Sequence, residues 1–267
     1  METATTLQHH WPDEASSSTL IAIRKSVRDR APGLIWLGGF KSDMLGTKAE
    51  AMVALAEQLG VSSLRFDYSG HGESGGEFTQ GTISRWVAES VAVILEQTFG
   101  PQILVGSSMG GWIALRLVQE LQKRGEKDRI AGLFLIAPAP DFTSELMEPA
   151  FSDEQREEMA QNGYVAEPTP YSDEPNIITR QLIEDGRNNL IFGSGLNVGK
   201  PVHILQGAAD PDVPADHAHR IVAELVHDNV ALTMVPDGDH RLSRDEDIAL
   251  LNRLLHQFVT RYTNEEL

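Results

Sequence analysis

Residues 103–112 have the sequence ILVGSSMGGW, and this stretch decides how the rest of the chain is interpreted. The apolar run ends in GSSMG, which fits the pattern G-x-S-x-G, and a helical pattern follows at once. A strand that turns into a helix within so few residues places the central residue in a strained turn, with its side chain above the carboxyl edge of the sheet. Glycines on both sides let strand and helix pack closely. The stretch predicts Ser108 as a nucleophile, although a Gly-Ser turn without chemistry fits the same short pattern.

Composition limits the class of protein. The 267 residues are 41% hydrophobic and 23% charged, which is ordinary for one large globular domain or two small ones. The net charge of −17 argues against nucleic acid and anionic membrane surfaces as partners, because both repel such a chain. The absence of cysteine excludes disulfides, thiolate metal sites and a cysteine nucleophile. No apolar run is long enough for a transmembrane helix.

The first 18 residues are polar and acidic, without a basic start or an apolar segment. They do not resemble a secretion signal or a mitochondrial presequence, so we expect a flexible tail over residues 1–18 and a cytoplasmic location. The oligomeric state is expected to be a monomer or a homodimer.

Short apolar runs alternate with amphipathic helical patterns along most of the chain. This alternation predicts an α/β fold, with a mostly parallel sheet covered by helices on both sides. Strands are expected over residues 20–23, 34–37, 63–68, 103–107, 130–137, 202–206 and 230–235, and helices over residues 47–59, 84–99, 109–123, 215–227 and from 243 onwards.

Residues 141–200 interrupt the alternation. They hold 12 acidic and 4 basic residues, four prolines and many large apolar side chains, with helical patterns and no convincing strand. Because this apolar content must be buried against something, the segment is predicted to be an inserted helical cap, or lid. The core domain then comprises residues 19–140 and 201–267.

Reactive groups in an open parallel sheet collect beyond the carboxyl ends of the strands. Ser108 follows the central predicted strand, Asp210 follows the strand at 202–206, and His240 follows the strand at 230–235. Ser, Asp and His in this order match the chain order of the α/β-hydrolase triad. Residues 38–40, Gly-Gly-Phe, follow the strand at 34–37.

Each of these residue types has a role in acyl transfer. A serine hydroxyl attacks effectively only when a base such as His240 takes its proton. The carboxylate of Asp210 would hold His240 in the right tautomer and stabilise its positive charge. The backbone N–H groups of Phe40 and Met109 are the candidate donors for the oxyanion that forms on the substrate.

Alternatives exist for each member of the predicted triad. Ser107 is the rival of Ser108, and Asp212 is the rival of Asp210. Asp237 and Asp239 are expected to be turn residues. His71 lies in a glycine-rich turn, where a structural hydrogen bond is the better interpretation. No spacing of His, Asp and Glu predicts a metal site, and no glycine-rich loop of the phosphate-binding type is present, so no cofactor is expected.

Four motifs together carry a resemblance to a known family: GGFKSDM at residues 38–44 with GTKA at 46–49, RFDYSGHG at 65–72, PQILVGSSMGGW at 101–112, and DHR at 239–241. On these motifs the chain resembles the α/β-hydrolase superfamily from about residue 20 to near its C-terminus. Within it, the chain is similar to the mitochondrial palmitoyl-protein thioesterases that also cleave acyl glucuronides such as that of mycophenolic acid, and to their bacterial relatives. The resemblance implies Ser108, Asp210 and His240 as the triad, and hydrolysis of carboxylic esters or thioesters without a cofactor. The cap segment matches the family only loosely, so the resemblance implies the type of reaction and does not imply those particular substrates.

The leading hypothesis is therefore a serine hydrolase that acts on a small or lipid-like acyl ester or thioester through an acyl-enzyme. A second hypothesis keeps the triad and changes the substrate to an amide or peptide, as in aminopeptidases of this fold, with the acidic cap as the anchor for an amine. A third is a non-catalytic binding protein with a hydrolase-like fold.

Overall fold

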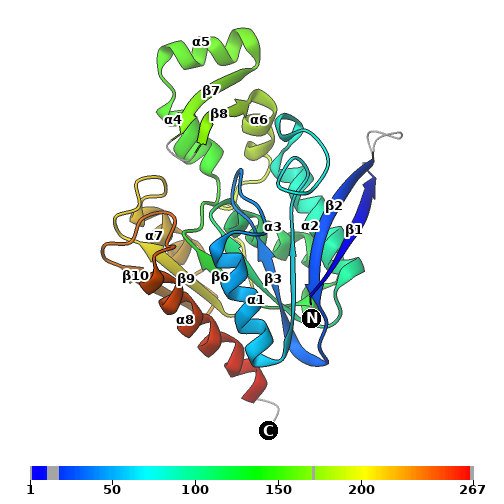
Figure 1. Cartoon of the computed structure of the whole chain (residues 1–267). Coiled ribbons are helices and arrows are strands. Elements are labelled where there is room, and N and C mark those ends of the chain that lie inside the picture. Colours follow the sequence, from blue (N-terminus) through cyan, green and yellow to red (C-terminus); the bar gives the residue numbers. More distant parts are fainter. Residues whose placement is uncertain (1, 11–17, 170–171, 265–267) are drawn as a thin grey trace.

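The computed structural model describes residues 2–10, 18–169 and 172–264. Eight strands form one sheet in the order β1-β2-β4-β3-β5-β6-β9-β10 (Figure 1). The six strands from β4 to β10 in this order are mutually parallel, while β1 and β2 are antiparallel to their neighbours. The mostly parallel α/β sheet predicted from the sequence is thus confirmed. The strands are β1 (Thr3–His10), β2 (Ser18–Ser26), β3 (Arg30–Leu37), β4 (Val61–Phe66), β5 (Gln102–Ser107), β6 (Ile130–Ile136), β9 (Val202–Gly207) and β10 (Val230–Val235).

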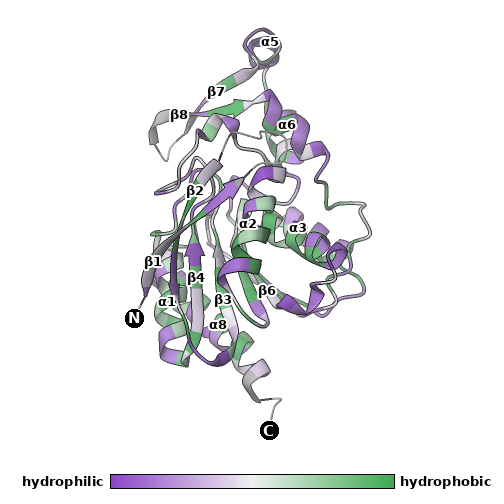
Figure 2. Cartoon of the chain, turned by 90° about the vertical axis from the view of Figure 1, so that its right-hand side faces the viewer, coloured by the Kyte–Doolittle hydropathy of each residue, from purple (hydrophilic) through white to green (hydrophobic). Residues whose placement is uncertain are grey.

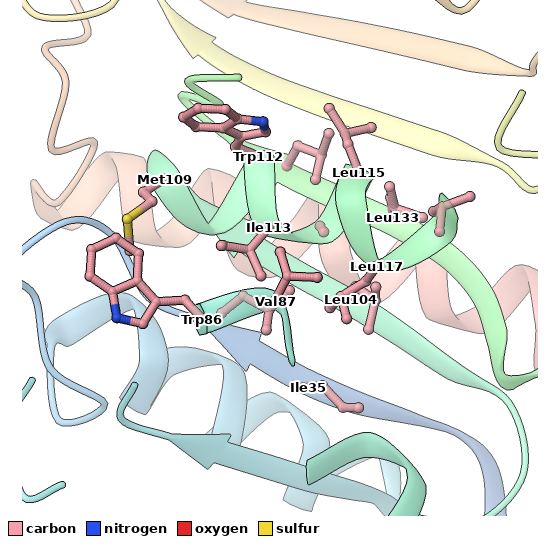
Figure 3. Packing of buried hydrophobic residues seen from close by; sticks show 14 of the residues in the cluster. Ile35, Trp86, Val87, Leu104, Met109, Trp112, Ile113, Leu115, Leu117 and Leu133 are labelled. Carbon is pink, nitrogen blue, oxygen red and sulfur yellow. The ribbon is translucent and has the colours of Figure 1, made fainter. Parts of the chain in front are cut away.

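Helices cover both faces of the sheet. One face packs against α2 (Ile83–Gln97), α3 (Met109–Lys123) and α7 (Ala215–Glu224), and the other against α1 (Thr47–Leu59) and α8 (Asp245–Asn264). Figure 3 shows the first interface, where Val87 of α2 and Ile113 of α3 pack toward Leu104 of β5, and Trp86 of α2 lies beside Met109 at the start of α3. Because β5 and β6 lie in the middle of the sheet with helices on both sides, every residue in them is buried. The core domain also contains two short 3₁₀ turns, η1 (Phe78–Gln80) and η2 (Lys127–Arg129).

The predicted flexible tail is wrong for residues 3–10, which form the edge strand β1. Each of its residues pairs with one of β2, from Thr3 opposite Lys25 to His10 opposite Ser18. An edge strand with one solvated face needs few apolar residues, and here Leu7 is buried opposite Ile21, so the sequence looks like a polar tail. Residues 11–17 of the predicted tail lie outside the described residues.

The segment between β6 and β9 lies beyond the carboxyl ends of the parallel strands (Figure 1). It contains a π-helical turn η3 (Thr143–Met147), α4 (Glu148–Ala150), α5 (Asp153–Asn162), β7 (Tyr164–Thr169), β8 (Ser172–Thr179) and α6 (Arg180–Arg187). A small apolar cluster of Phe151, Val165, Ile178 and Ile183 holds these elements together, while α5 is almost entirely hydrophilic (Figure 2).

The expectation of a purely helical cap is therefore wrong, because β7 and β8 form an antiparallel hairpin. The sequence pattern does not predict these strands because they contain Pro168 and Pro175, and proline within a run usually argues against a strand. A two-stranded hairpin has only edge strands, which tolerate proline because one side of each strand needs no partner. Val165 and Ile178 pair in this hairpin, and both are fully buried in the cap cluster.

Candidate active site

Ser108 lies in the tight turn between β5 and α3. Its backbone has φ 54° and ψ −118°, a conformation that an L-residue adopts only under strain. The turn is held by hydrogen bonds: the N–H of Ser108 donates to the Ile136 carbonyl at 2.9 Å, and its own carbonyl accepts from the N–H of Gly111 at 2.8 Å. The strained turn directs the Ser108 side chain away from the sheet, as the G-x-S-x-G pattern predicts.

Gly106 and Gly110 make this turn sterically feasible. A Cβ atom on Gly110 would overlap the carbonyl of Leu37 at the end of β3, and a Cβ atom on Gly106 would overlap the carbonyl of Gly110. The strand β5, the helix α3 and the neighbouring strand β3 therefore approach one another at a distance that only glycine permits.

His240 lies between Ser108 and Asp210. Its Nε2 is 3.0 Å from Ser108 Oγ, and its Nδ1 is 2.8 Å from Asp210 Oδ2. The Asp210 side chain is fully buried, and that of His240 is 17% exposed, so the histidine is the member of the pair that water or a substrate can reach. The structure thus brings together three predicted site residues that are far apart in the sequence. Asp210 follows Ser108 by 102 positions, and His240 follows it by 132 positions.

Asp210, and not its rival Asp212, holds the histidine. One oxygen of Asp210 accepts the N–H groups of Asp212 and Val213 at 2.9 and 2.8 Å, while the other accepts from Gln206 and faces His240. Four hydrogen-bond partners around one buried carboxylate fix its orientation.

The other acidic residues near His240 have structural partners. Asp239 accepts the N–H of Leu242, and Asp237 forms an ion pair with Arg244. Both thus behave as the turn residues that the sequence suggests.

Asp210, Asp212 and His240 also meet a minimal geometric criterion for a metal site, since one ligand atom of each lies within 4.8 Å of the others. Both oxygens of Asp210 already accept hydrogen bonds, and its Oδ2 faces His240 Nδ1. A cation bound there would have to displace these bonds. The donor set therefore fits a hydrogen-bonded relay better than a metal centre.

The loop after β3 lies against the serine. A Cβ atom on Gly39 would be 3.5 Å from Ser108 Cβ, so the backbone that carries the Phe40 N–H is adjacent to the nucleophile candidate. The Phe40 ring packs edge-on against Phe78 and Phe142 at 5.0 and 5.7 Å between ring centres. Met109, the other predicted oxyanion donor, begins α3 and is completely buried.

Two buried side chains connect this loop to the turn after β4. Asp67 accepts the N–H of Met44 at 2.7 Å and that of Glu73 at 2.8 Å, and burial raises its pKa above the usual value. His71 accepts the N–H of Lys41 at 3.2 Å, in keeping with the structural hydrogen bond expected for it. Residues 67–72, DYSGHG, therefore hold the loop beside Ser108 in place through hydrogen bonds to its backbone.

Two sets of contacts that the sequence did not reveal hold the cap segment in place. Asp141, just after β6, accepts the N–H groups of Ile191 and Phe192 at 2.8 and 2.9 Å, which ties the entrance of the segment to its exit. Burial raises the pKa of Asp141 to about 6. Lys41 Nζ donates to the carbonyl of Pro175 in β8 at 3.2 Å, joining the loop beside Ser108 to the cap hairpin. A lone Asp after a strand and a Lys after a Gly-Gly turn carry no local signal for such roles.

Known proteins share this fold and much of this sequence. Residues 31–252 match the alpha/beta hydrolase family. Mouse palmitoyl-protein thioesterase ABHD10, mitochondrial, is 31% identical over 228 residues, which cover 85% of this chain and 75% of the relative. The solved structure of mouse alpha/beta hydrolase domain-containing protein 10 has a TM-score of 0.84 at 28% identity, covering 97% of this chain and 99% of that one. A crystal structure from Agrobacterium vitis S4, provisionally described as a hydrolase, has a TM-score of 0.92 at 50% identity, with coverage of 97% and 99%.

The comparisons correct one expectation. The curated relatives are named as mitochondrial proteins, which contradicts the cytoplasmic location expected from residues 1–18. Among the helices of the described part of the chain, none is long and apolar enough to cross a membrane. By the matched residues, the strand order and the two related structures, this chain is a member of the alpha/beta hydrolase family.

Proposed function

We propose that this protein is a serine hydrolase that cleaves carboxylic ester or thioester bonds through an acyl-enzyme intermediate. The observation that carries the proposal is the position of His240, within hydrogen-bond distance of both Ser108 Oγ and the buried carboxylate of Asp210. This arrangement supports a nucleophile, a general base and an orienting group in one relay.

In the acylation step, Ser108 Oγ attacks the acyl carbonyl carbon while His240 Nε2 takes the hydroxyl proton. Asp210 accepts the hydrogen bond from His240 Nδ1–H and stabilises the imidazolium that forms. The N–H groups of Phe40 and Met109 donate to the oxyanion of the tetrahedral intermediate. As the intermediate collapses, the bond to the leaving alcohol or thiol breaks, and the proton on His240 goes to that group.

Deacylation repeats these steps with water as the nucleophile. His240 takes one proton from the attacking water, the second tetrahedral intermediate forms on the same donors, and collapse releases the carboxylic acid and returns the proton to Ser108. Every proton transfer passes through His240 Nε2, which is 3.0 Å from Ser108 Oγ.

The acyl group is proposed to be apolar and of medium to long chain. Phe142, Leu146 and Met147 lie where the cap segment leaves the core, and Phe142 contacts the Phe40 ring beside Ser108. The relatives named palmitoyl-protein thioesterase support a thioester with a long acyl chain. The surrounding excess of acidic residues disfavours polyanionic leaving groups.

A fluorophosphonate probe tests the reaction class, since it reacts covalently with an activated serine. The wild-type protein should be labelled at Ser108, and Ser108→Ala should lose labelling and hydrolysis by at least about 10³-fold. Ser107→Ala is the matched control and should keep the site. Labelling that persists in Ser108→Ala would refute the assignment of Ser108 as the nucleophile. A folded wild-type protein that no probe labels would refute the proposal and favour a binding protein.

Assays of the wild-type protein beside Ser108→Ala also test the substrate class. p-Nitrophenyl esters and acyl thioesters from two to sixteen carbons should be cleaved with a preference for the longer chains. Hydrolysis limited to acetyl substrates would contradict the acyl-chain assignment. Faster release of an arylamine from aminoacyl amides would replace it with the amide-hydrolase hypothesis.

A further inference from the structure

His71 lies directly beneath the loop that runs past Ser108. Only 4% of its surface is exposed, and its ring is enclosed by Tyr68, Phe78 and Trp86, with ring centres 5.6, 5.2 and 5.1 Å away. Three aromatic contacts leave the imidazole little freedom to rotate. The direction of its two nitrogen atoms is therefore set by packing.

The partners of the two ring nitrogens define the tautomer. Nδ1 is 3.1 Å from the Ser69 carbonyl, which can only accept, so Nδ1 carries the proton. Nε2 is 3.2 Å from the N–H of Lys41, which can only donate, so Nε2 is unprotonated. Burial lowers the pKa of His71 to about 4, which keeps the ring neutral and Nε2 available as an acceptor near neutral pH.

The bond to Lys41 fixes a tight turn. Lys41 has φ 55°, and the N–H of Ser42 donates to the carbonyl of Gly39 at 3.2 Å. That carbonyl belongs to the same peptide plane as the N–H of Phe40. Since carbonyl and N–H point in opposite directions across a trans peptide, a bond that holds the Gly39 carbonyl also aims the Phe40 N–H.

We propose that His71 is a positioning residue of the oxyanion hole: by accepting the N–H of Lys41, it holds the turn at residues 39–42 so that the Phe40 N–H meets the substrate oxyanion. The inference rests on the proposed serine hydrolase function. His71 does not touch the substrate and acts only through the backbone. Displacement of an oxyanion donor weakens transition-state stabilisation more than ground-state binding, so the effect appears in kcat.

Two amide substitutions separate the two ring nitrogens. In His71→Gln, the side-chain oxygen can reach the position of Nε2 and accept from Lys41. In His71→Asn, the shorter amide reaches only the position of Nδ1 and leaves the N–H of Lys41 without its acceptor. We expect His71→Asn to lower kcat by about 10- to 100-fold with KM within about twofold of wild type. His71→Gln should keep at least about a third of wild-type kcat.

Rates are expressed per active serine, counted by the end point of fluorophosphonate labelling, so that a partly unfolded sample does not imitate a slow enzyme. A trifluoromethyl ketone, which forms a tetrahedral adduct and occupies the oxyanion hole, should bind to His71→Asn more weakly by a factor similar to the loss in kcat. Equal kcat in His71→Asn and wild type, or equal loss in both variants, would overturn the proposal.

The wild-type protein provides a test that needs no variant. Long-range ¹H–¹⁵N NMR should show His71 as the neutral tautomer with its proton on Nδ1, and a proton on Nε2 would overturn the proposal. This result is independent of turnover. A wild-type protein that hydrolyses no ester or thioester refutes the proposed function, while active protein with an indifferent His71→Asn refutes only the role of His71.

Discussion

Glu89 shows how burial alone changes the chemistry of a single residue. It lies on α2, is fully buried, and accepts the N–H of Ser69 through Oε2 at 2.9 Å. Within the described part of the chain, neither its second oxygen Oε1 nor the buried hydroxyl of Tyr68 has a hydrogen-bond partner. Burial raises the pKa of Glu89 from 4.5 to about 7. Ionisation of this buried carboxylate therefore destabilises the folded state, even though the carboxylate accepts the N–H of Ser69.

Substituting Glu89→Gln should remove a pH-dependent loss of stability. Because the pKa is higher in the folded than in the unfolded chain, the folded state binds the proton more tightly, and the free energy of unfolding falls as pH rises from about 4.5 to about 7. The glutamine variant should match wild type at pH 4.5 and exceed it by up to about 3 kcal/mol at pH 8. Urea unfolding at the two pH values measures the difference.

Only the difference between variant and wild type is diagnostic here. His71, with its pKa lowered to about 4, makes the free energy of unfolding rise with pH between about 4 and 6.5, opposite in sign to the effect of Glu89. A Glu89→Gln variant whose stability follows wild type at every pH would show that Glu89 is ionised without cost.

Among the elements, the strand-turn-helix unit of β5 and α3 has the clearest local origin. Its sequence alone predicts the turn, because G-x-S-x-G places glycine where strand and helix must approach. Gly110 adds a tertiary contact, since its Cα packs against the carbonyls of Leu37 and Gly38 at the end of β3. The distance between the Ser108 turn and the loop that carries Phe40 therefore depends on this one glycine.

Gly110→Ala should separate these two elements. The added methyl group must displace backbone, so we expect a loss of about 2 kcal/mol or more in stability and slower fluorophosphonate labelling of Ser108. Gly46→Ala is the matched control: its φ is −62°, and its Cβ would meet the nearest atom at 3.8 Å. A Gly110→Ala protein as stable and as reactive as the control would contradict the close packing.

At the scale of the whole molecule, the N-terminal segment adds the edge strand β1 to the sheet, and Glu2, just before that strand, pairs with a buried cation. Arg65 of β4 is buried, and its guanidinium donates to Glu2 at 2.8 and 3.0 Å and to Glu50 at 2.6 Å. The ion pairs raise the pKa of Arg65 above its usual value. A segment expected to be a loose tail thus covers the edge of β2 and neutralises a buried cation.

Deletion of residues 1–10 should destabilise the protein and expose β2 to association. Loss of the charged hydrogen bonds to Arg65 and of the β1–β2 pairing is expected to lower the free energy of unfolding by more than about 2 kcal/mol, with aggregation on heating. Glu2→Gln should produce the smaller, charge-dependent share of this loss. Calorimetry and light scattering measure both. An unchanged melting temperature after the deletion would mean that β1 contributes nothing to stability.

Periodicity predicted most of the core. The buried strands and amphipathic helices appear near their expected positions because a strand covered on both faces must be apolar, and a helix on a sheet must be apolar on one side. Hydrophobic periodicity did not predict the strands that bury only one face or only a few side chains. Polar β1 lies at the sheet edge, and the proline-containing hairpin of β7 and β8 buries only a few side chains.

The sequence by itself determined the α/β order of elements, the strained serine turn and the positions of Ser108, Asp210 and His240 after their strands, because these properties depend on residues near one another in the chain. Only the tertiary structure decided which acid faces His240 and how His71 holds the loop at residues 39–42. It also decided how Asp141 joins the two ends of the cap segment and how Lys41 links that segment to the loop beside Ser108. The physical reason is that a hydrogen bond between distant residues requires a direction and a distance, and both are set by packing that no local pattern encodes.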